Sequence, residues 1–215
     1  MHPLARIITE ALDDSYPQPD GRWRRVPPWR DGVEAVLAFT AHAVLAVAPD
    51  VSDERLAALG VDGYGGANHP RVLVDLAGAD GWIDSLDALV VRRSVGGPTA
   101  LVERPDLRDH PRVAFATAIR DDVRVFGRPD RRSSTLATVS RGIGGLCEIS
   151  VELDADERGR GAGAALVEQV LAIMPAGEVV LAAIAPGNAA SLRAFLRAGF
   201  SVAGSVQLLR PSRTS

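Results

Sequence analysis

The stretch of the sequence best suited to chemistry is DERGRGAGAALVEQV, residues 156–170, where three glycines and two arginines precede an apolar helical segment. Glycine lets the backbone approach a ligand closely, and the start of a helix exposes unpaired N–H groups with a partial positive charge. A strand, a glycine loop and a helix in this order form a ready site for a phosphate group. We therefore expect the loop to bind an anionic ligand, with Arg158 and Arg160 adding charge.

Two common phosphate-binding motifs fit this loop poorly. Residues 159–164 match the dinucleotide fingerprint G-x-G-x-x-A in form, but DADER separates them from the preceding strand, and only about fifty residues follow. A second nucleotide-binding half does not fit in that length. A P-loop needs a lysine, and the sequence contains none. A tight turn that only packs the helix closely on the strand is the alternative without a ligand.

A third interpretation uses more of the sequence. The segment VELDADERGRGAGAALVEQVL resembles the strand, loop and helix of the GNAT acyltransferase superfamily, whose R/Q-x-x-G-x-G/A loop binds the pyrophosphate of acyl-coenzyme A. Arg158, Gly161 and Gly163 occupy the motif positions. Residues 188–200, NAASLRAFLRAGF, resemble the second signature of the same superfamily. The resemblance is clear over 146–200 and implies the GNAT fold, an α/β (α+β) architecture with a mixed central sheet, splayed parallel strands and flanking helices.

The resemblance also implies where acetyl-CoA, the expected acyl donor, would bind. The donor would lie in a V between the strands at 146–153 and 178–185, with the pantetheine arm paired to the first strand. A backbone N–H there could also hold the oxyanion that forms on the thioester carbonyl. The residues expected at this cofactor site are Val151, Leu153, Arg158, Gly159, Arg160, Gly161, Ala162, Gly163, Ala164, Asn188, Ser191 and Phe195. Asn188 could equally serve as a plain helix cap.

Two glutamates on the first of these strands are candidate general bases. Glu148 and Glu152 are four residues apart, so their side chains project from one face of the strand. If that face lines the cleft, either carboxylate could accept a proton from an attacking amine, directly or through water. Ordinary exposed carboxylates are the alternative. Cys147 points to the opposite face, so we expect it in the core rather than as a nucleophile.

Phe195 departs from the family pattern, in which this position is often a tyrosine that protonates the leaving thiolate. Phenylalanine cannot donate a proton, and general-acid help is worth about 10²–10⁴-fold in rate. A thiol has a pKa of about 8.5, so a thiolate can leave unaided. Tyr64, within a glycine-rich loop, could substitute as the acid.

The elements that must position these residues can be read from hydrophobic periodicity. From residue 85 onward we expect a strand, a helix, three successive strands, a helix, a strand, a helix and a final strand. This order predicts a mixed sheet that is antiparallel in its middle and ends in a βαβ unit. The expected strands are 85–93, 123–127, 134–143, 146–154, 178–185 and 200–209, and the expected helices are 110–123 (with Asp109 as its cap), 161–174 and a segment after 188 with Leu192, Phe195 and Leu196 on one face.

The N-terminal part carries none of the family's motifs. We expect an accessory lobe over 1–80, with an irregular proline-rich arm over 1–32, a strand hairpin over 33–48 that breaks near Thr40, and short helices at 4–13, 52–59 and 71–78. The GNAT core would cover 83–210. GNAT domains usually continue past the last strand found here, so that strand's edge needs a cover, which the strands at 33–48 could provide.

Composition limits the remaining function classes. The net charge of −3 gives no support for a nucleic-acid binder. One cysteine and four scattered histidines predict no metal site, and no segment is apolar enough over sufficient length for a membrane partner, so we expect a cytoplasmic protein. The arginine-only, Ala- and Gly-rich composition suggests a bacterial source. A homodimer could form.

Together these observations predict an acyl-CoA-dependent N-acyltransferase that transfers acetyl to a primary amine, carried by a small molecule or a peptide. The alternative is a CoA-binding domain with little catalysis, acting as a sensor or structural partner. A cluster of charged residues could face the acceptor, although a solvated helix face is the more common role. The cluster comprises His110, Arg112, Arg120, Asp121 and Asp122.

Overall fold

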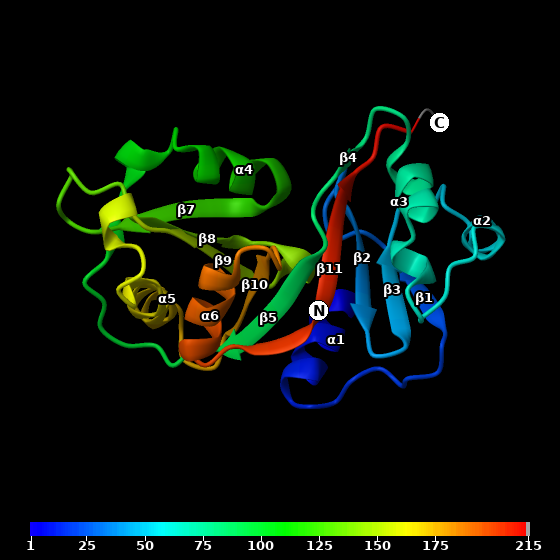
Figure 1. Ribbon diagram of the computed structural model, residues 1–215, viewed down its shortest axis with the longest axis horizontal. Helices are drawn as coiled ribbons and strands as arrows, with labels where there is room; N and C mark the ends of the chain where they lie inside the picture. Colours follow the sequence, from blue (N-terminus) through cyan, green and yellow to red (C-terminus); the bar gives the residue numbers. More distant parts are fainter. Residues whose placement is uncertain (214–215) are drawn as a thin grey trace. The chain divides into compact units, whose positions relative to one another are not determined.

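The computed structural model describes residues 1–213, which form two compact units. One unit comprises Met1–Leu89 together with residues 203–213, and the other is Val90–Val202 (Figure 1). The chain passes between the units within β5 (Asp87–Arg93) and within β11 (Ser201–Arg210). The units therefore do not follow chain order alone, and the assignment of domains to 1–80 and 83–210 stays a prediction.

The N-terminal unit is built on a strand hairpin that closes with the end of the chain. Its strands β2 (Glu34–Phe39) and β3 (His42–Ala46) pair antiparallel around Ala41, whose φ of 49° places it in the left-handed region of a tight turn. The expected hairpin with a break near Thr40 is therefore confirmed. The strands of this unit, apart from β11, are β1 (Trp23–Val26), β2 (Glu34–Phe39), β3 (His42–Ala46) and β4 (Trp82–Ile83).

The last strand of the chain is covered by this hairpin. β11 pairs antiparallel with β2, from Ser205 opposite Ala38 to Leu209 opposite Glu34. The expectation that the strands within 33–48 cover this edge is thereby confirmed, and the cover comes from the same chain. β2 and β11 both contribute apolar side chains to the core of the unit, since Val36 and Leu209 are fully buried in one cluster.

Helices of the N-terminal unit begin at capping side chains. The side-chain oxygen of Ser52 accepts a hydrogen bond from the amide of Arg55 at 3.2 Å and starts the second helix. The helices are α1 (Pro3–Leu12), α2 (Asp53–Ala58) and α3 (Pro70–Ala77), close to the predicted ranges. The proline-rich arm was expected to be irregular, but Trp23–Val26 forms β1, parallel to β3.

The second unit contains the mixed sheet that the sequence predicts. Its strands lie in the order β5, β10, β9, β8, β7, β6. The neighbouring strands from β6 to β9 pair antiparallel, and β9 and β10 pair parallel. This arrangement of helices and a mixed central sheet confirms the fold class. The strands beside β5 are β6 (Val102–Glu103), β7 (Asp121–Gly127), β8 (Leu136–Arg141), β9 (Cys147–Glu152) and β10 (Val179–Ile184).

Three helices accompany this sheet, α4 (Pro111–Ile119), α5 (Ala162–Ile173) and α6 (Ala189–Arg197). The apolar face of α5 packs with β9 and β10 in one core, which includes Val167, Ile149 and Val180. α4 starts differently from the prediction, because His110 and not Asp109 caps it, accepting from the amide of Arg112 at 3.2 Å. Leu196, which was expected to share a face of α6 with Leu192 and Phe195, is 42% exposed, whereas Phe195 is buried.

Within residues 1–213, no helix is both long and apolar enough to cross a membrane. The same described residues contain no cluster of three or more His, Cys, Asp or Glu side chains arranged to hold a metal ion.

Candidate functional site

The parallel strands β9 and β10 pair only at their beginnings. Cys147 lies opposite Val180 and Glu148 opposite Leu181, and no further β9–β10 pair exists among residues 1–213. β9 continues to Glu152 and β10 to Ile184, so the two strands separate beyond Glu148. The expected V between splayed strands is therefore present, with its apex at Glu148.

The glycine loop leaves the open side of this V and enters α5. Gly159 and Gly161 have φ angles of 80° and 81°, a left-handed conformation that side chains rarely adopt. Gly161 is the N-cap residue of α5, and in the described chain no side chain caps this helix. A Cβ atom at either glycine would meet nothing within 4 Å. The space beside these two glycines is therefore open, and an anion there could accept hydrogen bonds from the first amides of α5.

Gly163 has a different role from the other two glycines. A Cβ atom at this position would lie 3.1 Å from the side chain of Ala194 in α6. The close approach of α5 to α6 therefore favours glycine here, because a side chain would have to displace Ala194 slightly. At this one position, the interpretation of the loop glycines as packing residues is supported.

The two loop arginines are exposed. The Nε atom of Arg158 donates to the carbonyl of Leu153 at 3.2 Å, and its guanidinium lies 4.0 Å from the carboxylate of Glu152. This contact folds Arg158 back over the end of β9. The side chain of Arg158 has the freedom to turn toward an anion at the loop, because an exposed ion pair costs little to break.

Glu148, at the apex of the V, is sealed inside the unit. Its side chain is 1% exposed and forms an ion pair with Arg120, with 2.6 Å between Oε1 and Nη2. The amide of Ile143 donates to its other oxygen at 3.2 Å. The guanidinium of Arg120 is also buried, and its Nε and Nη1 atoms have no hydrogen-bond partner among the described residues. The charge of this candidate base is therefore balanced within the protein.

Glu152, at the open end of β9, is about one-third exposed. Its carboxylate accepts a hydrogen bond from Nε of Arg112 in α4 at 2.7 Å. Glu148 and Glu152 thus both pair with arginines from 110–122, and they share a face of β9 as predicted. The interpretation of that charged cluster as a solvated helix face is wrong for Arg120, because its side chain is 6% exposed and pairs with the buried Glu148.

Asn188 and Phe195 of α6 both have structural roles. The side-chain oxygen of Asn188 accepts from the amide of Ser191 at 3.1 Å, so the capping role is confirmed. Phe195 is 2% exposed and meets Phe200 edge to face, with 5.0 Å between the ring centroids. A contact of Asn188, Ser191 or Phe195 with a cofactor stays a prediction.

Cys147 lies in the core, as expected. Its side chain is 3% exposed, and burial raises the pKa of its thiol to about 12. The thiolate is the reactive form of cysteine, so this residue cannot serve as a nucleophile near neutral pH.

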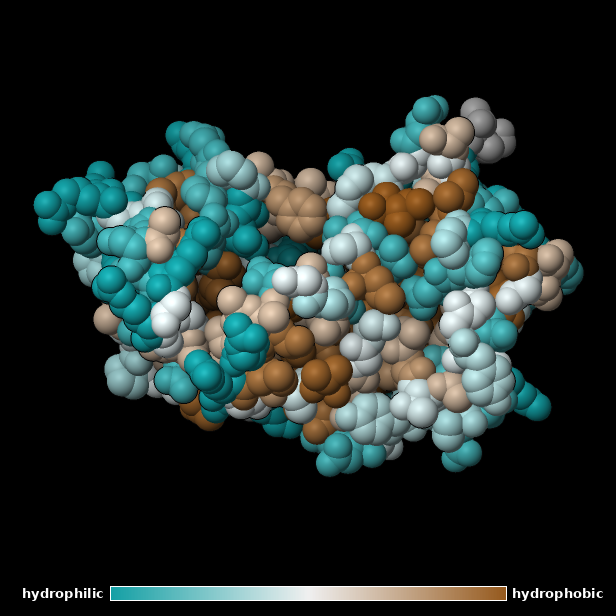
Figure 2. Space-filling view, viewed as in Figure 1, coloured by the Kyte–Doolittle hydropathy of each residue, from teal (hydrophilic) through white to brown (hydrophobic). Residues whose placement is uncertain are grey.

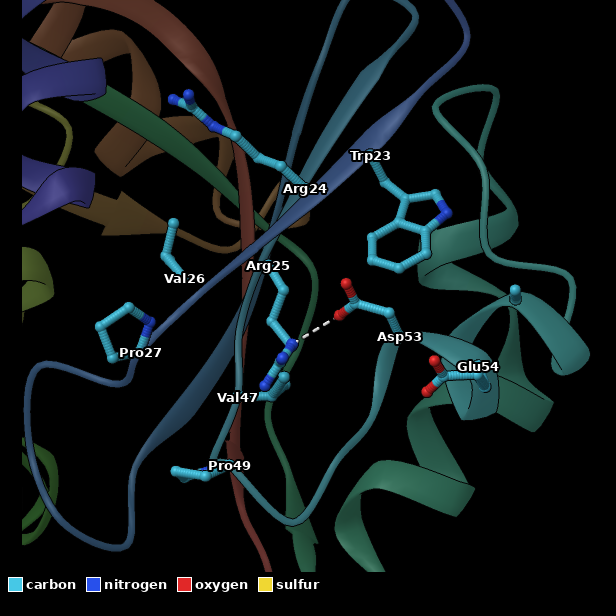
Figure 3. Close-up of a pocket in the computed structure, with 10 residues that line it drawn as sticks. Trp23, Arg24, Arg25, Val26, Pro27, Val47, Pro49, Asp53 and Glu54 are labelled. Carbon is cyan, nitrogen blue, oxygen red and sulfur yellow. Dashed lines mark hydrogen bonds and ion pairs between the residues drawn. The ribbon is translucent and has the colours of Figure 1, made fainter.

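A separate hollow of about 860 Å³ lies in the N-terminal unit, along strand β1 and the start of α2 (Figure 3). The side chain of Arg25 crosses it to pair with Asp53 at 2.7 Å. None of the predicted site residues lines it, and Tyr64, the suggested alternative acid, is 76% exposed elsewhere in this unit.

β1 is an edge strand only four residues long, and Arg24 and Pro27 protect such an edge from pairing with another chain.

Residues 107–200 match the family model described as Acetyltransferase (GNAT) family. Among solved structures, the chain is similar to a GNAT-family acetyltransferase from Novosphingobium aromaticivorans DSM 12444, at 19% identity and a TM-score of 0.42, over 64% of this chain and 70% of the other. A GCN5-related N-acetyltransferase from Kribbella flavida has 14% identity, 68% and 65% coverage and a TM-score of 0.40. A GNAT-family acetyltransferase from Colwellia psychrerythraea has 11% identity and a TM-score of 0.39, over 69% of this chain and 63% of the other. No curated protein sequence matches the chain significantly.

Proposed function

Because residues 107–200 match the model of the GNAT acetyltransferase family, we propose that the protein transfers an acetyl group from acetyl-CoA to a primary amine in a ternary complex. The observation that carries this proposal is the glycine turn at the uncapped start of α5, placed at the open side of the V between β9 and β10. The V offers room for an extended arm, and the turn offers amides for a diphosphate at the end of that arm.

The chain's own groups divide the work of holding the donor. The amides of Arg160 to Ala164 cradle the pyrophosphate, and the guanidinium groups of Arg158 and Arg160 add charge at the loop. The backbone of Val151 and Leu153 pairs with the pantetheine arm as an added strand would, because this part of β9 is not paired to β10. Asn188 and Ser191 border the same arm from the start of α6.

Of the two glutamates, we favour Glu148 as the general base. Glu152 lies at the loop end of β9, beside the diphosphate, whereas the thioester end of an extended arm reaches back toward the apex at Glu148. The amine nitrogen attacks the thioester carbonyl, so a C–N bond forms and the C–S bond breaks. The Glu148 carboxylate is 1% exposed and paired with Arg120, so it does not contact the amine directly, and a water molecule relays the proton from the amine to it. A backbone N–H of β9 holds the oxyanion.

The leaving thiolate takes its proton from solvent in this scheme. Phe195 has no hydroxyl group and is buried against Phe200, so it cannot be the acid. With a thiol pKa of about 8.5, the thiolate is a stable leaving group at neutral pH. The same feature favours a second candidate function, a CoA-binding domain with little turnover that acts as a sensor or structural partner.

Two measurements test these candidates. A rise in melting temperature with CoA or acetyl-CoA is the expected result for donor binding, since a ligand that binds only the folded state stabilises it. Release of free thiol from acetyl-CoA in the presence of a panel of small amines and peptides is expected for an acetyltransferase. Binding without thiol release across the panel would favour the second candidate, and no binding of CoA would refute both.

A further inference from the structure

The four residues that lead from β9 into the glycine loop are held by a turn from a different part of the sheet. The side chain of Asp154 accepts from the hydroxyl of Ser133 at 2.9 Å and from the amide of Ser134 at 3.1 Å. The hydroxyl of Ser134 also donates to it and is the main cause that lowers the pKa of Asp154 below its ordinary value. Both serines lie in the turn between β7 and β8.

Thr135 closes the other end of this segment. Its hydroxyl accepts from the amide of Asp154 at 2.9 Å and donates to the carboxylate of Glu157 at 2.7 Å. The side chain is fully buried, at 0% exposure. The second oxygen of Glu157 lies 2.9 Å from the guanidinium of Arg128. A single buried hydroxyl group therefore fixes both the first and the last residue of 154–157, directly before Arg158.

The turn that provides these groups is itself anchored. Arg104, whose side chain is 4% exposed, donates from Nη1 to the carbonyls of Arg128 at 2.8 Å, of Asp130 at 3.2 Å and of Ser133 at 3.2 Å. The other side of its guanidinium binds Asp106. Figure 2 shows a hydrophilic surface over this turn, in which Arg131 and Arg132 are exposed. The buried contacts of the turn thus point inward, toward the segment that precedes the loop.

The charges of the segment explain why such control would matter. Asp154, Asp156 and Glu157 place three carboxyl groups within four residues, immediately before a loop to which we assign a diphosphate. These negative charges would repel a diphosphate bound so close to them. The donors on Asp154 and the pairing of Glu157 with Arg128 and Thr135 direct two of the three carboxylates to protein partners.

We infer that Thr135 is a positioning residue for the donor-binding loop. Its hydroxyl sets the path of 154–157, orients the amides of 160–164 toward the diphosphate and holds the Glu157 carboxylate away from it. This inference rests on the proposed function for the identity of the ligand. The tie between Thr135 and the segment does not depend on it.

The test compares Thr135→Val with a matched control in the same unit. Thr138→Val also removes a hydroxyl group at 0% exposure, one that pairs with Ser150 at 2.7 Å in mid-sheet and does not touch the loop. With CoA as the probe in calorimetric titration, we expect Thr135→Val to raise Kd about tenfold, the size of a lost hydrogen bond to a charged group. Thr138→Val should leave Kd near the wild-type value, and Thr135→Ser should restore it.

Amide hydrogen exchange of the ligand-free protein provides the second measurement. We expect faster exchange over 154–164 in Thr135→Val and an unchanged rate there in Thr138→Val. Equal Kd values and equal exchange in the two valine variants would overturn the inference. If wild-type protein fails to bind CoA, the proposed function fails, and the exchange experiment alone decides whether Thr135 positions the loop.

Discussion

The beginning and the end of strand β9 carry glutamates on the same face, in opposite surroundings. Glu148 is 1% exposed beside Arg120, which is 6% exposed, whereas Glu152 and Arg112 are each about one-third exposed. The difference follows from the sheet, since β10 still pairs with β9 at Glu148 and has separated from it before Glu152. One strand thereby has a sealed end, where we propose the general base, and an open end, where we propose the donor-binding loop.

The same residue type therefore meets different physical demands at the two ends of the strand. A buried ion pair holds a fixed geometry but is expensive to disturb, because each charge needs its partner once water is excluded. A half-exposed pair contributes little stability and can rearrange when a ligand arrives. The loop end adds left-handed glycines and an uncapped helix, which are also suited to a ligand rather than to stability.

The largest expected effect separates the two glutamates as bases. Glu148→Gln should lower kcat by about 10²–10⁴-fold, because the amine loses its proton acceptor. Glu152→Gln should retain most of the activity. Initial rates of thiol release with saturating acetyl-CoA measure both variants. A strong loss only in Glu152→Gln would reverse our assignment of the base.

The second effect concerns stability. Arg120→Ala leaves Glu148 buried without its cation and should lower the free energy of unfolding by about 3–5 kcal/mol. Arg112→Ala, which breaks the more exposed pair, should lower it by about 0–1 kcal/mol. Urea titration followed by circular dichroism provides both values. Similar losses in the two variants would mean that the ends of β9 do not differ as described.

The third effect concerns the open end. Gly161→Val should weaken CoA binding at least about tenfold, because the side chain strains a φ of 81° and crowds the amides. Gly177→Val is the matched control, since Gly177 also has open space and a φ of 86° but lies after α5. Calorimetry with CoA compares them. Equal affinities in the two variants would contradict the assignment of the loop.

A fourth measurement concerns the sealed end through Cys147. With a pKa raised to about 12 by burial, the thiol should stay unmodified by iodoacetamide at pH 8 in folded protein and react after unfolding in urea. Mass spectrometry gives the modified fraction. Rapid modification of the folded protein would show that the start of β9 is open to solvent.

The smallest effect lies beyond the open end, at Asp154. Ser134→Ala removes the main cause of its lowered pKa, so that pKa should rise toward the ordinary value of an aspartate. A depressed carboxyl pKa stabilises the fold above the unfolded-state pKa, and this stabilisation is lost as the pH falls through the folded-state pKa. As the pH falls, the variant should therefore lose this small stabilisation of the fold at a higher pH than the wild type does. Carbon-detected NMR titration of the Asp154 carboxyl group measures the change.

Local sequence patterns were sufficient to predict β9, the glycine loop, α5, β10 and α6. Apolar periodicity sets such elements, and left-handed positions such as Gly161 demand glycine, so each leaves a mark within a few residues. The hairpin at 33–48 was equally readable. These predictions succeed because the interactions that determine them are close in the sequence.

The contacts that sequence patterns did not predict join distant residues. Arg120 pairs with Glu148, 28 positions later, and Thr135 binds Glu157, 22 positions later. No residue near Arg120 or Thr135 in the sequence indicates the distant partner, because each pair is brought together only by the folded sheet. The strand at Trp23–Val26 was missed because the prolines around it favoured an irregular arm, whereas backbone pairing with β3 decides the strand.

The pairing of β11 with β2 has a consequence for how the chain is made. Ser205 lies opposite Ala38, a partner that left the ribosome 167 residues earlier. Throughout that interval the nascent hairpin has one bare flank, and contacts between residues so far apart form slowly. We expect chains that stop before β11 to be substrates for chaperones, and protein that stays soluble during expression to be the fraction whose final strand has docked.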